Sequence, residues 1–377
     1  MNEGYLPNLP WHADAWQTLQ PLRMRDVHAV LLHGAAGIGK KSLALDLARA
    51  ALCESPQADG HACGACTGCL LTAAGNHPDL RVVVPDAMAI WRGAASDDDE
   101  GPEDVGPEAG EPGEAAIEVN GKARRVSREI RIEQVRALSD FVATSTHRGG
   151  NRVVMLAPAE LLNTASANAL LKMLEEPPPR SLFVLATDAL DDVLPTIRSR
   201  CVLVRVPAPP RAVALAWLAA QQVDDAEVAL AAAGGSPLLA LAQAAGTALD
   251  ADTRAILVEL LGRGGQLAAA DIAARVPKAV PVGPALQLFQ RWGWDLLALS
   301  AVRSARVVRY HPNAAAPLER LARQSEPAAV LQWLGRLSGL RATQDHPLNP
   351  RLVIEAALLD YLRCFDAAGG GPAALRR

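Results

Sequence analysis

The stretch that decides the fold is Ala29-Val-Leu-Leu-His-Gly34-Ala-Ala-Gly-Ile-Gly39-Lys40. Its first part is a short apolar run typical of a buried strand, and helical periodicity follows from residue 40 to about residue 52. Glycines between a strand and a helix let backbone N–H groups face phosphate oxygens, and a lysine at the helix start can reach the terminal phosphates. We therefore predict a phosphate-binding loop; the alternative is a glycine-rich turn without a ligand. The candidate ligands are Gly34, Gly37, Gly39 and Lys40.

Two groups that hydrolysis would require are missing from this loop and its surroundings. The residue after the lysine should carry a hydroxyl for Mg²⁺, but it is Lys41; Ser42 is one position late, which rotates it by roughly 100° around the helix. A carboxylate should also follow a later strand, where the sequence has Ala157 and Pro158. Glu160 lies beyond the proline, poorly placed to polarise a water. We expect ATP to bind weakly or not at all, with no intrinsic ATPase.

Apolar runs alternate with helical periodicity through the first two hundred residues. Continuous apolar strands separated by helices are typical of a parallel sheet that is covered on both faces. The predicted fold class is therefore an α/β P-loop domain. Besides the first strand, strands are predicted at residues 80–84, 152–156, 182–186 and 202–206, and further helices at about residues 132–144 and 165–174.

The composition changes after residue 206, where Pro207-Ala-Pro-Pro210 marks a boundary and an Ala- and Leu-rich, helical pattern begins. We predict an α/β domain over residues 1–206, a small helical domain over 207–246 and a larger all-helical domain over 247–377. Residues 93–121 are acidic and contain hardly any large apolar side chains, so we expect a disordered insertion there. Four tryptophans are expected to anchor helical cores: Trp217, Trp292, Trp294 and Trp333.

A cysteine cluster follows the first helix, with ligand candidates Cys53, Cys63, Cys66 and Cys69. Four thiolates in a short loop suit tetrahedral Zn²⁺ and leave no open coordination position, which is typical of a structural site. His61 and His77 are possible substitutes for one ligand. The alternatives are an iron–sulfur cluster and free buried cysteines. We expect structural zinc.

Composition narrows the function classes. The net charge of −4 argues against a protein that wraps nucleic acid through a broad basic surface. No stretch of about 18 residues is free of charged residues or turn formers, so we expect no membrane span. The first sixteen residues lack the basic start and apolar run of a signal peptide. A cytoplasmic protein is expected.

Three further strings, in order along the chain, indicate a family. They are Ser166-Ala-Asn-Ala-Leu-Leu-Lys-Met-Leu-Glu-Glu-Pro177, Leu182-Phe-Val-Leu-Ala-Thr187 and Thr196-Ile-Arg-Ser-Arg-Cys201. Together with the phosphate loop and the cysteine cluster after its helix, they resemble the clamp-loader subunits of bacterial DNA polymerase III, which belong to the AAA+ group of ATPases. The resemblance covers most of residues 1–245.

This resemblance assigns roles to single residues. Arg200 matches an arginine finger that acts in trans on ATP bound to a neighbouring subunit. Thr187 matches the first sensor of the terminal phosphate. At the second sensor the chain has Gly235-Ser-Pro-Leu238 where active relatives carry an arginine, which removes a phosphate contact.

The resemblance implies a non-hydrolysing structural and regulatory subunit of the polymerase holoenzyme, with a C-terminal oligomerisation domain of the collar type. The implied partners are γ/τ-type ATPase subunits, a δ-type subunit and, through the complex, the sliding clamp and primed DNA. Two alternatives stay open: an active ATPase subunit of the same loader, and an unrelated P-loop regulator whose cysteines sense metal or redox state.

Overall fold

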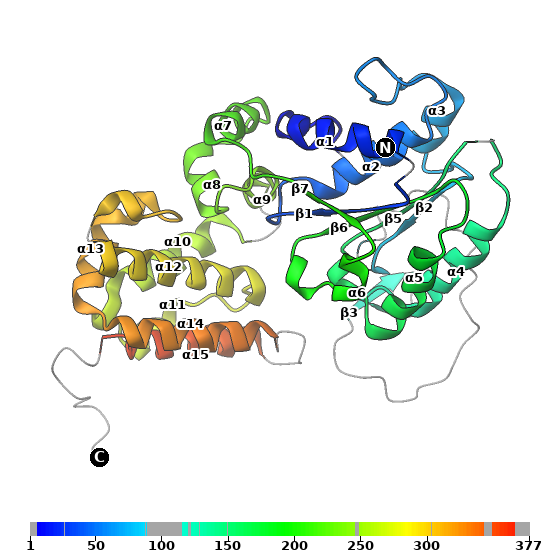
Figure 1. The fold of residues 1–377 in the computed structure, drawn as a ribbon. Coiled ribbons are helices and arrows are strands. Elements are labelled where there is room, and N and C mark those ends of the chain that lie inside the picture. The colour runs from blue at the N-terminus through cyan, green and yellow to red at the C-terminus, as the bar shows by residue number, and fades with distance from the viewer. Residues whose placement is uncertain are drawn as a thin grey trace. The chain divides into compact units, whose positions relative to one another are not determined.

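The computed structural model describes residues 6–25, 27–86, 88, 115–119, 122–127, 129–148, 150–245, 249–302, 304–342 and 349–365. The chain forms two compact units, Met1–Pro210 and Arg211–Arg377 (Figure 1).

The first unit is built on a five-stranded sheet. Its strands are β1 (Ala29–His33), β2 (Leu80–Val83), β5 (Arg152–Leu156), β6 (Ser181–Thr187) and β7 (Val202–Arg205). They lie in the order β2-β5-β6-β1-β7. Every neighbouring pair in this sheet is parallel, which confirms the sheet type expected from the continuous apolar runs. The carboxyl ends of the strands therefore meet at one edge, where His33 is paired with Thr187.

Helices cover both faces of this sheet (Figure 1). They are α1 (Ala13–Met24), α2 (Lys40–Ala51), α3 (Thr67–Ala73), α4 (Ile132–Ala143), α5 (Thr164–Glu175) and α6 (Pro195–Arg198). Alternate side chains of a strand point to opposite faces, so Val30 and Leu32 join a core with α1 and α2, whereas Ala29 and Leu31 join a core with α4 and α5. Short 3₁₀ helices lie at Pro10–His12, Ala159–Leu161 and Leu190–Asp192.

The expected disorder of residues 93–121 needs a correction at one end. Ala115–Val119 forms strand β3, which pairs antiparallel with β4 (Lys122–Val126) as a separate two-stranded sheet. The β-branched Ile117 and Val119 suit such a hairpin, although the acidic residues before them do not. Residues 93–114, 120 and 121 lie outside the described residues.

The described residues of the second unit form helices and the segments that connect them, and none of these residues forms a strand. Its helices are α7 (Arg211–Ala220), α8 (Ala226–Ala232), α9 (Pro237–Ala244), α10 (Ala251–Arg263), α11 (Ala269–Arg275), α12 (Val282–Val302), α13 (Ala315–Gln324), α14 (Pro327–Ala342) and α15 (Pro350–Leu362), with 3₁₀ turns at Gly264–Gln266, Ala305–Val307 and Pro312–Ala314. The first three, α7, α8 and α9, share a small core around Leu218 and Leu230. Among the described residues no single helix is long and apolar enough to cross a membrane, although the bent pair α8 and α9 meets that test jointly.

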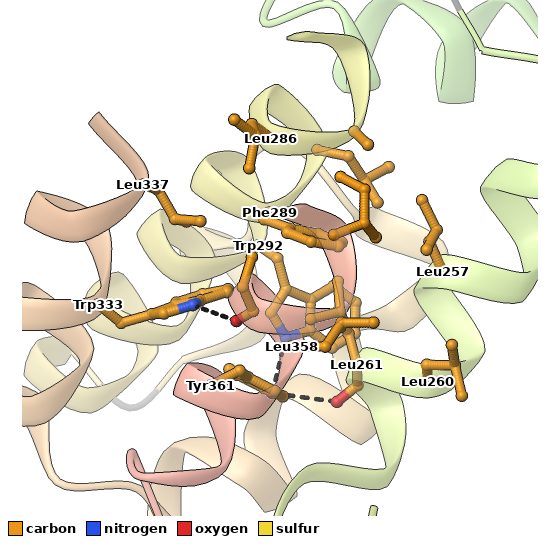
Figure 2. Packing of buried hydrophobic residues seen from close by; sticks show 14 of the residues in the cluster. Leu257, Leu260, Leu261, Leu286, Phe289, Trp292, Trp333, Leu337, Leu358 and Tyr361 are labelled. Atoms are coloured by element: carbon orange, nitrogen blue, oxygen red, sulfur yellow. Dashed lines mark hydrogen bonds between the residues drawn. The ribbon is translucent and has the colours of Figure 1, made fainter. Parts of the chain in front are cut away.

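Helices α10 to α15 pack around buried aromatic residues (Figure 2). Trp292 donates its indole N–H to the Tyr361 hydroxyl at 3.0 Å, and that hydroxyl donates to the Leu261 carbonyl at 3.0 Å. Trp333 is equally buried and donates to the Ala357 carbonyl. Trp294 does not anchor the core as expected, because it is 55% exposed. Two positions after Trp292, it lies on the far side of the same helix.

Candidate functional site

The predicted phosphate loop connects the end of β1 to the start of α2, as expected. Two of its glycines are required by the packing alone. A Cβ on Gly34 would lie 2.4 Å from the Val206 carbonyl oxygen. Gly39 has a φ of +85° and its Cβ would lie 2.4 Å from Leu9 Cδ1. Side chains at these positions would clash with Val206, which directly follows β7, and with the N-terminal segment, so the loop conformation depends on glycine whether or not a ligand binds.

Lys40 is buried, and its ammonium group is directed at acceptors from its own chain. Lys40 Nζ donates to the carbonyl oxygens of Gly34 at 2.9 Å and Ala35 at 2.5 Å. The same nitrogen forms an ion pair with Asp188 Oδ1 at 2.5 Å, and the lysine side chain is 3% exposed. An ammonium group has three N–H donors. These three contacts match the full donor capacity of the group that would bind the terminal phosphates.

Asp188 follows the last residue of β6, the strand that pairs with β1, and so lies at the carboxyl edge of the sheet. Thr187, the predicted sensor, is buried, and its hydroxyl accepts from the Ala189 N–H at 3.1 Å. Glu160 Oε1 accepts from the Asp188 N–H at 3.0 Å. Thr187 was predicted as a site residue from the sequence. Asp188 was not predicted, and Glu160 was judged to be poorly placed. The missed signal is the acidic residue directly after a central parallel strand, where ligand sites of such sheets gather.

The residues after Lys40 are also engaged within the chain. Burial lowers the pKa of Lys41, whereas the neighbouring carboxylates of Asp188 and Glu160 act to raise it. Lys41 Nζ contacts Met88 Sδ at 3.1 Å. Ser42 is buried, and its hydroxyl accepts from the Leu6 N–H at 3.3 Å. The Ser42 hydroxyl, which lies one residue after the position of the Mg²⁺ ligand, thus contacts the N-terminal segment of the chain.

This N-terminal segment, residues 6–12, packs against the loop. Trp11 Nε1 and His12 Nε2 both lie 2.8 Å from the carbonyl oxygen of Ile38 and donate to it. Burial lowers the pKa of His12, although its hydrogen bond to Ile38 acts in the opposite direction. The loop is therefore held from the strand side by Val206 and from the other side by the start of the chain.

The four predicted thiol ligands come together at the other end of α2. Their Sγ atoms all lie within 4.8 Å of one another. The Cys53–Cys66 and Cys63–Cys69 sulfur pairs are 3.9 and 3.8 Å apart. Zinc–sulfur bonds of about 2.3 Å place the sulfurs of a regular tetrahedron about 3.8 Å apart. The cluster could therefore hold a metal ion of this size and geometry.

Backbone N–H groups point at these sulfurs, as they do in thiolate metal sites. Cys66 Sγ accepts from the N–H groups of Glu54 and Cys69. Burial raises the pKa of Cys66, but these donors, together with hydrogen bonds to the Cys69 and Cys63 thiols, outweigh it and bring the pKa to about 6. Burial raises the pKa of Cys69 to about 12. The set thus contains one thiol that ionises readily and one that needs a cation beside it to do so.

The two histidines considered as substitute ligands have other partners. His61 stacks on Trp16, with the ring centroids 4.0 Å apart. His77 Nδ1 accepts from the Asp79 N–H at 3.1 Å. Within the part of the chain that the structure describes, the four cysteine sulfurs therefore form the candidate metal site without a histidine ligand.

The cysteine loop is attached to α1 by two side chains of that helix. The Trp16 indole donates to Asp59 O, and Arg23 donates to Gly60 O. A metal bound by the four sulfurs would therefore fix a loop that already contacts the first unit at a second place.

Arg200, the predicted finger, lies just after α6 in a separate group of charges. Its side chain is 34% exposed and forms an ion pair with Glu175 Oε1 at 2.5 Å. Nη1 donates to the Thr196 carbonyl at 3.0 Å. Glu175 is the last residue of α5, within the acidic string that indicated the family, but its contact with Arg200 was not predicted. The arginine is held against its own unit with part of its surface open to solvent.

Comparisons with known proteins agree with these motifs. The family described as DNA polymerase III, delta subunit, matches residues 14–210. DNA polymerase III subunit delta' of Pseudomonas aeruginosa is 40% identical over 235 residues, which cover 61% of this chain and 60% of that protein. The Escherichia coli K12 protein of the same name is 34% identical over 222 residues, covering 58% and 54%. The matched region therefore spans less than two thirds of either relative.

Among solved structures, a gamma subunit-related protein of DNA polymerase III from Thermotoga maritima is similar with a TM-score of 0.43 and 18% identity, covering 93% of this chain and 99% of that one. The sequence matches confirm the resemblance that the motifs indicated. The chain belongs to the DNA polymerase III delta subunit family.

Proposed function

We propose that this chain is a non-hydrolysing subunit of a DNA polymerase III clamp loader, and that it supplies Arg200 to ATP bound on a neighbouring ATPase subunit. The observation that carries this proposal is the contrast between two cations. Lys40 is buried among three acceptors of its own chain, whereas Arg200 is one third exposed. The missing hydroxyl and carboxylate for Mg²⁺ support the same division of roles.

Arg200 suits this role chemically. Charge develops on the phosphoryl oxygens during transfer, and a guanidinium placed beside them stabilises it without losing a proton. The ion pair with Glu175 and the bond to Thr196 O restrict the side chain before a partner arrives. Binding to a phosphate would exchange one anionic partner for a more highly charged one.

The proposed partners are γ/τ-type ATPase subunits and a δ-type subunit in the cytoplasm, and the sliding clamp and primed DNA through the complex. Residues 207–246 would act as the lid domain and residues 247–377 as the collar-type oligomerisation domain. The separate cores around Leu218 and around Trp292 support this division. Thr187, Gly34, Gly37, Gly39 and Lys40 would form a degenerate nucleotide site.

We infer that Cys53, Cys63, Cys66 and Cys69 bind structural zinc. Zinc would supply a closed tetrahedral crosslink rather than chemistry, because four protein sulfurs leave no position for a substrate. The sulfur spacing and the N–H groups directed at the sulfurs support this ligand set. Trp16 and Arg23 of α1 would hold the cysteine loop in place beside the metal.

The proposal is tested by replacing Arg200 with Ala in a reconstituted loader. We expect normal assembly by gel filtration and at least about a tenfold lower clamp- and DNA-stimulated ATPase at the site that Arg200 serves, since trans arginines contribute on the order of 10³ or more. Arg211→Ala is the matched control, because Arg211 forms an exposed ion pair with Glu227 in the second unit. Unchanged turnover would remove Arg200 from the mechanism.

The isolated chain supplies a second measurement. We expect no ATP turnover above background, because the Mg²⁺ ligands are missing. Robust turnover that Lys40→Ala abolishes would instead establish the active-ATPase alternative.

A further inference from the structure

We propose that Asp188 excludes nucleotide from the phosphate loop by occupying the ammonium group of Lys40. This inference deepens the proposed function, on which it rests, because it names the residue that keeps the degenerate site closed. The loop alone has the glycines and the lysine that would suit a phosphate. What it lacks in this structure is a free donor on Lys40.

The ammonium group of Lys40 has acceptors for all of its hydrogen atoms. Gly34 O, Ala35 O and Asp188 Oδ1 lie between 2.5 and 2.9 Å from Nζ. The lysine side chain is 3% exposed, so water does not compete for these donors. A phosphate could contact Nζ only by displacing one of these acceptors, and a short charge-assisted hydrogen bond to a buried ammonium group resists that exchange.

The position of Asp188 is set by the sheet. Its carboxylate is carried at the end of β6, next to the β1 end from which the loop starts. Its backbone N–H is bonded to Glu160 Oε1 at 3.0 Å. Asp188 is therefore placed by the sheet and by a neighbouring 3₁₀ turn, and only its side chain would need to turn away to open the site.

Carboxylates offset part of the positive charge beside the loop. Glu160 Oε2 is buried and has no hydrogen-bond partner within the part of the chain that the structure describes. Asp188 and Glu160 both act on Lys41, the other cation beside the loop. Two carboxylates thus lie beside two lysines, which lowers the positive potential that would attract a polyphosphate. Removing the carboxylate of Asp188 makes the loop more positive.

The test uses the full-length chain and equilibrium binding of a fluorescent ATP analogue, with and without Mg²⁺. Asp188→Asn keeps the size of the side chain and removes its charge; Asp188→Ala removes the acceptor altogether. We expect both variants to bind the analogue at least tenfold more tightly than the unmodified chain. The Asp188 side chain is 45% exposed, so both variants should keep the melting temperature within a few degrees.

Two further variants make the outcome specific. Asp192→Asn removes an exposed carboxylate in the 3₁₀ helix Leu190–Asp192 and should leave binding unchanged. Adding Lys40→Ala to Asp188→Ala should abolish the gain. Equal binding by Asp188→Asn, Asp188→Ala and the unmodified chain would overturn the inference, as would a gain that survives Lys40→Ala. Because the loader function is tested through Arg200 in the assembled complex, either proposal can fail without the other.

Discussion

Helix α2 has a candidate ligand site at each end, and the two ends differ in how their polar groups are engaged. At its start, the Lys40 ammonium already contacts two carbonyls and a carboxylate of the chain. Beyond its end, four sulfurs lie within 4.8 Å of one another, close enough to hold a metal ion together, and the candidate site contains no histidine. A motif identifies which atoms could bind a ligand, whereas the surrounding elements decide whether those atoms are available.

The largest expected effect is at the cysteine end. Cys69→Ser should abolish stoichiometric zinc and lower the free energy of unfolding of the first unit by about 3 kcal/mol or more, because Cys69 is buried and metal binding contributes to folding. Zinc content by mass spectrometry and urea unfolding measure both effects. Cys201→Ser is the control, since Cys201 lies in the same unit outside the cluster. A variant that retains one zinc per chain would contradict the four-sulfur site.

The next effect compares two glycines, one near each end of α2. Gly39 and Gly64 have φ values of +85° and +76°, but a Cβ meets Leu9 and His12 at Gly39 and nothing within 4 Å at Gly64. Gly39→Ala should therefore cost about 2–4 kcal/mol, from backbone strain plus overpacking. Gly64→Ala should cost about 1 kcal/mol, from strain alone. Urea unfolding checks the difference; equal losses would mean that the loop does not pack against the N-terminal segment.

A smaller loss of folding stability is expected at low pH, from His12 beside the phosphate loop. Burial lowers the pKa of His12 in the folded chain, so below the unfolded value of about 6.5 the unfolded chain binds more protons. The stability that is present above pH 6.5 is therefore lost as the pH falls. We expect a loss of at most about 1 kcal/mol between pH 7 and pH 5.5 from this group. Urea unfolding of His12→Gln should show a smaller loss over the same interval; an identical pH dependence would assign the effect to other groups.

The smallest effect concerns the hydroxyl that is one position late. Ser42→Ala removes a 3.3 Å contact with the Leu6 N–H and should cost less than about 1 kcal/mol in urea unfolding. Nucleotide binding should not change, because the hydroxyl serves the N-terminal segment. Ser166→Ala is the matched control: that hydroxyl donates to Ile130 O at 2.7 Å, and its loss should cost more. If the unmodified chain bound nucleotide only with Mg²⁺ and Ser42→Ala lost this binding, the Ser42 hydroxyl would instead be a ligand of the metal.

Much of the fold could be read from local pattern. The strands around Leu31, Val154 and Val184 are continuous apolar runs, and such runs between helices specify a covered parallel sheet. The pairing of β3 with β4 was missed because the acidic residues before β3 dominate the composition of that stretch. Trp294 was misjudged because its exposure depends on which side of α12 faces the bundle.

The sequence by itself determined the ligand types: glycines and a lysine after a strand, four cysteines in one loop, and an arginine in a family motif. These are local spacings, and local spacing sets which groups a segment presents. Only the tertiary structure decided which groups these side chains contact. Asp188 contacts Lys40, and Glu175 contacts Arg200, because the sheet and helices bring distant chain segments together. The strength of a charged contact depends on burial and distance, and neither is encoded at a single position.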